Sequence, residues 1–141
     1  MKDLRKIAEE MMERMFGADT EQQVQETKTW MHEQSLQLTA EERAEVGRIH
    51  RELMAERRKK RGEKRTDINV KELLGDAGEV ISMSYIAKHY FKKDRTWLYH
   101  RINGTVINGS KSAFTDDELK IFRFALEEIG AKVSGLSVSI H

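Results

Sequence analysis

The chain has 141 residues, of which 38% are hydrophobic and 35% charged, a balance that favours small helical units with thin cores over one large core. It contains no cysteine, which excludes a disulfide framework, a thiolate nucleophile and a cysteine zinc site. The formal net charge is only +1.

The charges are unevenly distributed along the chain. Residues 1–56 hold 8 Lys/Arg and 13 Asp/Glu, whereas residues 57–101 hold 13 and 6 and residues 102–141 hold 4 and 5. A basic middle segment in a nearly neutral chain points toward a polyanionic partner. The apolar runs are too short to span a membrane, and the start "MKDLRKIAEE" lacks the apolar block of a signal peptide. We therefore expect a cytoplasmic protein with no membrane partner.

The first two predicted helices follow directly from apolar spacing and capping residues. Residues 3–16 carry apolar side chains at helical intervals, and Gly17 is placed as a C-terminal cap. Thr20 and Gln23 form a capping-box pattern that opens the second helix. The inner stripe of this second helix is predicted to be Val24, Thr27, Met31 and Leu38, with Trp30 beside it.

A third helix is predicted over residues 40–61, opened by a second capping-box pattern, Thr39 and Glu42. Its apolar stripe is Val46, Ile49, His50 and Leu53. The three stripes are narrow for such long helices, which is typical of a helical hairpin or a coiled-coil-like pairing. We therefore predict that residues 1–61 form a dimerisation or interaction region.

A strongly basic run, "RRKKRGEKRT", follows over residues 57–66. It can be the solvated end of a helix and a linker, because cations are favoured at a helix C-terminus. It can also be an arm that binds phosphates, and the sequence leaves both interpretations open. Gly62 marks the best domain boundary, with residues 62–66 as a basic linker and residues 67–141 as a second domain.

The second domain is predicted to contain short capped helices. A brief helix runs from Ile68 to Gly75, and Ser82–Tyr90 forms another, with Ser82 as its cap. A third covers Asp94–Asn103 and ends at Gly104, a residue suited to the left-handed conformation. Its inward-facing pair is Leu98 and Ile102, and Trp97 is expected to flank them against the preceding helix.

A loop with two Asn-Gly pairs is predicted next, followed by a helix that opens at the capping box Thr115 and Glu118. The buried stripe of that helix is predicted to be Leu119, Phe122, Leu126 and Ile129, and Gly130 is predicted to end it. The tail "VSGLSVSIH" alternates unevenly, so it can be a short edge strand or disordered, and we predict a flexible tail.

The paired short helices "YIAKHYFKKDRTWLYHRING" resemble the phage-repressor and Cro-like group of helix-turn-helix DNA-binding domains. The resemblance rests on Ile86-Ala87 in the first helix and on Ile102-Asn103-Gly104 at the end of the second. The later segment "ALEEIGAKV" is also similar to that group, while the "YFKK" stretch replaces its small turn residue and predicts a wider turn. Residues 81–133 are similar as well to a domain of unknown function in small Bacteroides-type proteins.

The resemblance implies a small helix-turn-helix domain, and the helices predicted from apolar spacing place a long helical hairpin or coiled-coil-like region before it, so we expect an all-α fold. In such a domain the second helix reads bases, for which Arg95 suits guanine and Thr96 suits the thymine methyl group. Tyr99 and Arg101 suit phosphates, and neighbouring lysines hold the backbone. The candidate DNA-binding residues are Lys92, Lys93, Arg95, Thr96, Tyr99, His100, Arg101, Asn103 and Lys111. The alternative is that Trp97 and Tyr99 are core residues and that the charges only solvate the surface.

No catalytic or metal-binding pattern stands out. The five histidines lack the spacing of a helical metal site, and "NGTVINGS" lacks the flanking elements and the lysine of a phosphate-binding loop. We expect no enzymatic activity, no cofactor and no small-molecule ligand. The sequence predicts a homodimeric, sequence-specific DNA-binding protein of the transcriptional-regulator type. A protein-interaction adaptor that uses the N-terminal helices is the main alternative, and RNA binding is a third.

Overall fold

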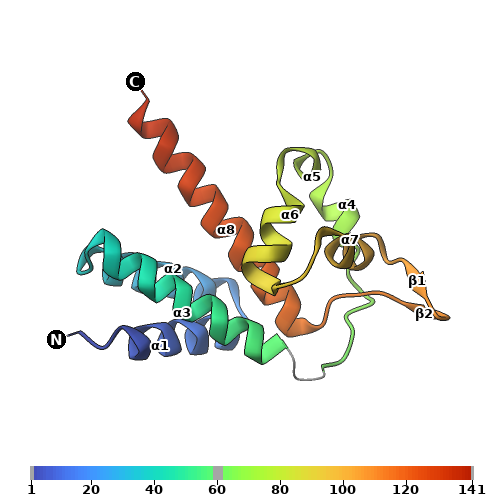
Figure 1. The fold of residues 1–141 in the computed structure, drawn as a ribbon, viewed down its shortest axis with the longest axis horizontal. Coiled ribbons are helices and arrows are strands. Elements are labelled where there is room, and N and C mark those ends of the chain that lie inside the picture. Colours follow the sequence, from blue (N-terminus) through green and yellow to red (C-terminus); the bar gives the residue numbers. More distant parts are fainter. Residues whose placement is uncertain (1, 59–61, 141) are drawn as a thin grey trace. The chain divides into compact units, whose positions relative to one another are not determined.

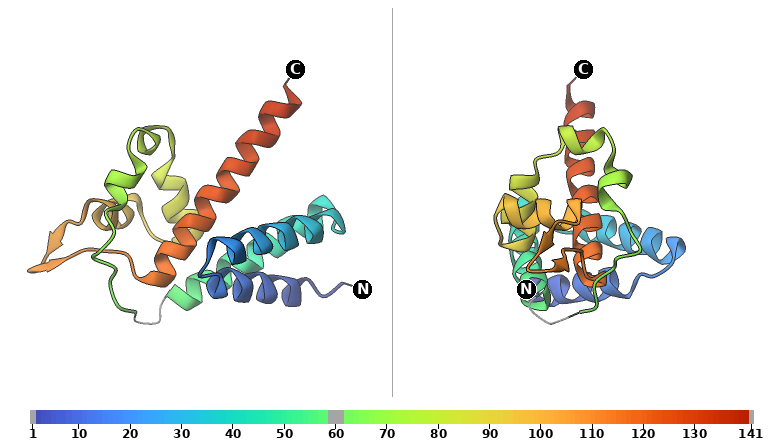
Figure 2. Two further views of the ribbon diagram at one scale, coloured as in Figure 1. Left: turned by 180° about the vertical axis from the view of Figure 1, so that it is seen from behind. Right: turned by 90° about the vertical axis from the view of Figure 1, so that its right-hand side faces the viewer.

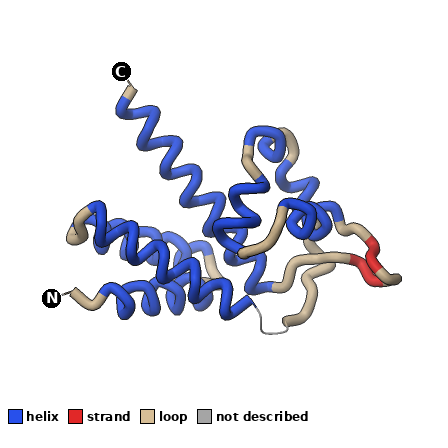
Figure 3. Tube along the Cα trace, viewed as in Figure 1, coloured by secondary structure: helices blue, strands red, loops and turns tan. Residues whose placement is uncertain are grey.

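The structure is a computed structural model that describes residues 2–58 and 62–140 (Figure 1). Its regular structure is helical apart from a small two-stranded hairpin within the described residues (Figure 3). The expected all-α fold class is thereby confirmed. The chain divides into two compact units, Met1–Lys59 and Lys60–His141.

The first unit consists of α1 (Leu4–Gly17), α2 (Glu21–Leu36) and α3 (Ala40–Arg58). α1 packs along α3, and α2 packs against α1. The centre of this unit is a small apolar cluster made of Ala8, Leu38, Val46, Ile49 and Leu53, with Leu4, Ile7, Met11 and Met12 packed around it. The predicted C-terminal end of the third helix, at Arg61, lies outside the described residues.

Both capping boxes predicted in the first unit are confirmed. The Thr20 hydroxyl accepts a hydrogen bond from the Gln23 amide, and the Gln23 side chain accepts one in return from the Thr20 amide. At α3, the Thr39 amide donates to Glu42 Oε1 at 2.9 Å, and the Glu42 amide donates to Thr39 Oγ1 at 3.1 Å. These bonds satisfy amides that the start of a helix leaves without an intrahelical partner.

The predicted glycine cap of α1 is wrong. Gly17 is the last residue of the helix, and the C-cap is Ala18, whose backbone is extended with φ −84° and ψ 98°. Because the chain leaves the helix through an extended residue, it needs no left-handed glycine there.

The predicted apolar stripe of α3 is confirmed, since Val46, Ile49 and Leu53 are all buried. His50 is buried too, and burial, aided by the positive charge of Arg51, lowers the pKa of His50 to about 4. Its imidazole is therefore neutral near pH 7. By contrast, none of the side chains of α2 is buried, and Val24, Thr27 and Met31 of its predicted stripe are only half-buried. Leu38, the last residue of that stripe, is buried but lies after the end of α2 at Leu36.

The described part of the second unit contains eight elements, most of them short. In chain order they are α4 (Val70–Leu74), α5 (Ala77–Val80), α6 (Met83–Ile86), the π-helix η1 (Ala87–Phe91), α7 (Arg95–Asn103), β1 (Val106–Ile107), β2 (Ser110–Lys111) and α8 (Asp116–Ser139). Aromatic rings connect η1 to α8 and to the segment before it. The ring of Tyr90 lies 6.3 Å from that of Phe124, Phe91 lies 6.3 Å from Phe114, and Phe114 lies 5.4 Å from Phe122.

The helix predicted from Ile68 begins later, at Val70, because Asn69 takes the capping position and its side chain accepts a hydrogen bond from the Glu72 amide at 3.1 Å. It ends as predicted at Gly75, where φ is 48°. α5 was not predicted, since four residues are too few to show a helical period.

The predicted loop after Gly104 is instead a β-hairpin, in which Val106 pairs with Lys111 and Ile107 with Ser110. Its turn residues Asn108 and Gly109 have φ of 53° and 78°. Left-handed conformations at both positions match the twist of the flanking strands, which explains the Asn-Gly pair. Strands of two residues are too short to reveal an alternating pattern.

The last helix is longer than predicted. Its capping box is confirmed, with the Thr115 amide donating to Glu118 Oε1 at 2.9 Å and the Glu118 amide donating to Thr115 Oγ1 at 3.2 Å. The predicted stop at Gly130 and the predicted flexible tail are wrong, because α8 continues to Ser139. The stripe is only partly right: Phe122 is buried, whereas the fully buried neighbours also include Ile121, Phe124 and Ala125. None of the described helices is long and apolar enough to cross a membrane.

Candidate nucleic-acid interface

A short turn, residues 92–94, joins the helical segment formed by α6 and η1 to α7, and most of the candidate residues lie in this turn and on α7. The Ser82 hydroxyl accepts a hydrogen bond from the Tyr85 amide and opens α6, which continues as the π-helix η1. The amides of both Lys92 and Lys93 then donate to the carbonyl oxygen of Ala87. These two bonds close η1 and redirect the chain toward α7.

Lys92 lies in the turn where the phage-repressor and Cro-like group has a small residue, which the "YFKK" stretch replaces in this chain. Its backbone is left-handed, with φ 57° and ψ 39°, a conformation that costs a residue with a Cβ about 1–2 kcal/mol. The turn is therefore made without glycine, and a charged side chain is placed between the two helices. A cation held in a strained turn is consistent with a role for the side chain outside the fold.

We expect Lys92→Gly to leave the free energy of unfolding unchanged or raise it by up to about 1 kcal/mol, because glycine adopts the left-handed conformation without strain. Lys93, whose φ is not positive, is the matched control, and Lys93→Gly should lower the unfolding free energy. Urea unfolding followed by circular dichroism distinguishes the two. A loss of stability in Lys92→Gly equal to that in Lys93→Gly would show that the turn is not strained.

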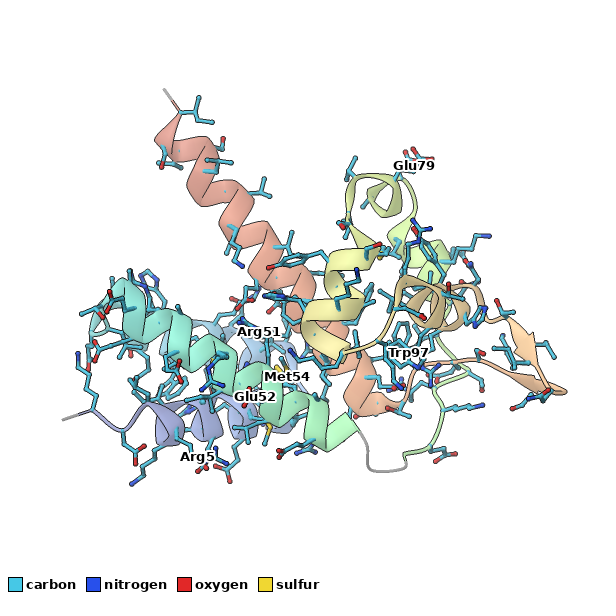
Figure 4. All side chains as sticks on the ribbon, viewed as in Figure 1. Arg5, Arg51, Glu52, Met54, Glu79 and Trp97 are labelled. Carbon is cyan, nitrogen blue, oxygen red and sulfur yellow. The ribbon has the colours of Figure 1, made fainter. Side chains whose placement is uncertain are left out.

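The helix α7 has one buried and one exposed face. Asp94 Oδ1 accepts a hydrogen bond from the Trp97 amide at 2.9 Å and caps the helix as predicted. Leu98 and Ile102 are buried, which confirms the predicted inward pair. Trp97, labelled in Figure 4, is half-buried. Its ring lies 5.1 Å from that of Phe91 in η1. The side chains on the outer face are therefore those of Arg95, Thr96, Tyr99 and Asn103, all exposed.

Arg101 differs from the other candidate residues because its side chain is held within the unit. Its guanidinium carbon lies 4.1 Å from the centre of the Trp97 ring, and its Nε lies 3.4 Å from Oε1 of the buried Glu118. Glu118 thus both caps α8 and anchors α7 through Arg101. No local pattern pointed to this pair, because the two residues lie 17 positions apart. His100 is half-buried, and its carbonyl oxygen accepts the amides of Gly104 and Thr105.

The β-hairpin lies beside the C-terminal end of α7. A Cβ placed on Gly104 would come within 2.7 Å of Lys111 Cε, so the Lys111 side chain passes directly over the end of the helix. Lys64 holds the hairpin from the other side, since its Nζ donates to Ser110 Oγ and to the Lys111 carbonyl oxygen, both at 3.1 Å. Sequence reasoning assigned Lys64 only to a linker.

The predicted basic segment before the second unit is partly engaged in the fold. Arg65 contacts Asp67 at 2.9 Å and Asp116 at 2.7 Å, and its amide donates to the Phe114 carbonyl oxygen at 2.7 Å. A polar cavity of about 280 Å³ lies between this segment, the end of α7 and the hairpin, with Arg65, Arg101 and Lys111 in its wall. Residues 59–61 of the proposed phosphate-binding arm lie outside the described residues.

The cationic side chains around the turn and α7 are not paired with carboxylates, unlike many other cationic side chains in the chain. Within the described residues, no carboxylate forms an ion pair with any of the exposed side chains Lys88, Lys92, Lys93, Arg95 and Lys111. In the first unit, by contrast, Arg5, Arg14 and Arg48 each pair with a glutamate on their own helix. An unneutralised group of cations around an exposed helix can hold an anionic partner.

Residues 70–140 match the family model described as a domain of unknown function (DUF5053). The chain belongs to this family. The match spans α4 to α8 and therefore includes α7, the hairpin and most of the second unit. The match confirms the expectation that this part of the chain is similar to a domain of unknown function. The resemblance to phage repressors stays a prediction. No curated protein and no solved structure matches the chain.

The described part of this DUF5053 chain contains no group of three or more His, Asp or Glu side chains that could hold a metal ion.

Proposed function

We propose that this chain binds double-stranded DNA with sequence preference through the exposed face of α7, in the manner of a transcriptional regulator. The observation that carries the proposal is the group of exposed cations around the turn and α7 that no described carboxylate neutralises. Duplex DNA is a dense polyanion, and lysine and arginine side chains that neutralise its phosphates supply most of the non-specific affinity.

The N-terminal turn of α7 is suited to base contacts. Arg95 and Thr96 are its first two residues and both are exposed. An α-helix fits the major groove of B-DNA, where arginine bonds guanine through two acceptors and threonine contacts the thymine methyl group. Asn103, at the other end of the exposed face, is an amide side chain that suits adenine.

The flanking lysines are suited to phosphate contacts. Lys92 and Lys93 precede the helix, Lys88 lies on η1, and Lys111 lies over the C-terminal end of α7. Lysines on both sides of a base-reading helix fix its position on the duplex without reading the sequence. In this proposal Arg101 has a positioning role, because its guanidinium lies between Trp97 and Glu118 and holds α7 in place.

The adaptor function is the second candidate, and one observation favours it. None of the side chains of α2 is buried, and Leu36 at its end is 71% exposed, so this helix is accessible to a protein partner. RNA binding through stacked aromatic rings is weaker, since one face of Trp97 is covered by Arg101 and its ring also contacts Phe91. Of the two aromatic rings of α7 that were candidates, Tyr99 remains for stacking, with 38% of its side chain exposed.

We expect Arg95→Ala to cost about 1–3 kcal/mol of binding free energy on preferred DNA fragments and to relax the preference among fragments. The reason is that the variant loses a bidentate contact to one base. Titration of a selected fragment and a scrambled duplex measures both effects. Arg95→Lys is the matched control, because it keeps the charge and loses the paired geometry, so it should retain non-specific binding and lose preference. An equal loss on both duplexes would show that Arg95 contacts only the backbone.

A further inference from the structure

The C-terminal part of α8 is an exposed apolar surface that the second unit does not use. From residue 130 to residue 140 the described side chains are exposed, and this end of the helix extends beyond α4 to α7 of its own unit (Figures 1 and 2). Val133 and Leu136 are each 62% exposed and Ile140 is 73% exposed. A helix that presents several large apolar side chains to solvent is typical of an interaction site.

The spacing of the apolar residues on α8 is that of a coiled coil. Phe122, Leu126, Ile129, Val133, Leu136 and Ile140 follow one another at alternating intervals of four and three residues. Phe122 is buried within the protein, Leu126 and Ile129 are half-buried, and the last three are exposed. The stripe that packs against the core at the start of α8 therefore continues along the same face after the unit has ended.

The residue types on this stripe select one kind of partner. Among the exposed residues of the stripe, Val133 and Ile140 are at heptad position a and Leu136 is at d, whereas the half-buried Leu126 and Ile129 pack within their own unit. β-Branched residues at a with leucine at d favour two parallel strands. A parallel pair places each a residue opposite the same residue of the partner, so a second copy of this chain supplies the complementary surface by symmetry.

The charges on this segment permit the same pairing. Residues 129–140 contain a single charged side chain, Lys132, at a g position. Its Nζ lies 3.4 Å from the hydroxyl of Tyr85 in the same chain. Across a parallel pair, a g residue faces the next e residue, which here is Ser137, so no two like charges meet. The match to the family model runs to residue 140, which places this stripe within the domain itself.

We propose that two copies of this chain associate in parallel through residues 126–140 of α8, with Val133, Leu136 and Ile140 in the seam. The proposal does not depend on DNA binding, and it places a dimer contact outside the predicted dimerisation region, residues 1–61. Residues 126–140 cover only about two heptads, and their exposed part, residues 130–140, is shorter still, so the association should be weak and depend on protein concentration.

The test uses the full-length chain, which has no native cysteine. Val133→Cys places a thiol in the seam, and Val138→Cys, at an f position and 78% exposed, is the matched control on the opposite side of the helix. A disulfide requires Cα atoms about 4.4–6.8 Å apart, which a parallel pair provides at position 133 and not at position 138. Under mild oxidation we expect a covalent dimer from Val133→Cys at least about tenfold faster than from Val138→Cys. Equal rates would overturn the proposal.

Sedimentation at several protein concentrations separates this seam from other dimer contacts. We expect Leu136→Asp to weaken association by about tenfold or more, because it buries a charge in the seam, whereas Val138→Asp should have little effect. Far-ultraviolet circular dichroism confirms that both variants remain helical. A wild-type chain that is monomeric up to its solubility limit would contradict the proposal. A dimer unaffected by Leu136→Asp would place the contact elsewhere, including residues 1–61, and would contradict it as well.

Discussion

Phe91→Ala should lower the free energy of unfolding of the second unit by about 3–5 kcal/mol, since it removes a fully buried aromatic ring and leaves a cavity. Phe91 lies at the end of η1, and its ring contacts those of Trp97 in α7 and Phe114 before α8. One side chain therefore connects the three segments that present the candidate interface.

The chain has two tryptophans, one in each unit, which allows the second unit to be followed by itself. In a Trp30→Phe background, the fluorescence of Trp97 during urea unfolding reports the second unit. Phe91→Leu is the matched control and should cost much less than Phe91→Ala, since it keeps most of the buried volume. A loss below about 1 kcal/mol in Phe91→Ala would show that the ring does not hold α7 in place.

A triple variant, Lys92→Gln, Lys93→Gln and Arg95→Gln, should weaken binding to all DNA fragments by roughly tenfold to a thousandfold near physiological salt. It should also reduce the slope of log K against log salt by roughly two, because Lys92 and Lys93 each lose a phosphate contact that contributes about 0.9. The three side chains are exposed and outside every ion pair among the described residues, so their removal should leave the fold intact. Fluorescence anisotropy with labelled duplexes measures both quantities.

The control for this variant removes the same formal charge from the first unit, by Arg5→Gln, Lys6→Gln and Lys28→Gln. All three side chains are exposed, in α1 and α2. If binding depends on the total charge alone, the two triple variants should lose affinity equally. If DNA binding depends on the exposed face of α7, only the variant at Lys92, Lys93 and Arg95 should lose most of the salt dependence of its DNA affinity. Equal losses would therefore contradict the proposed location of the site.

The features predicted correctly from the sequence are those set by local hydrogen bonds. The capping residues Thr20, Thr115 and Asp94 each bond an amide three positions later, so the pattern contains both partners. The left-handed Gly104 at the end of α7 was predicted for the same reason, since its φ of 66° follows from how a short helix closes.

The features predicted wrongly depend on context that the local pattern does not contain. Gly130 does not end α8, because a glycine inside a helix costs only about 1 kcal/mol and each further residue adds a hydrogen bond once the helix exists. The tail after Gly130, with its alternating serines and valines, was predicted to be flexible, but it continues the helix because α8 has already formed before it. The role of Arg101 could not be predicted either, since Glu118 comes from another helix and approaches only when the chain folds.

The most direct test of DNA binding by this chain is a titration of the full-length wild type against duplex DNA at two salt concentrations. We expect binding that weakens as salt rises, with a slope of log K against log salt of roughly −3 to −4, as four phosphate contacts would give. Lys88, Lys92, Lys93 and Lys111 are the side chains that would make them. Binding that is absent at low salt, or that does not change between the two salt concentrations, would contradict the proposed function and favour the adaptor.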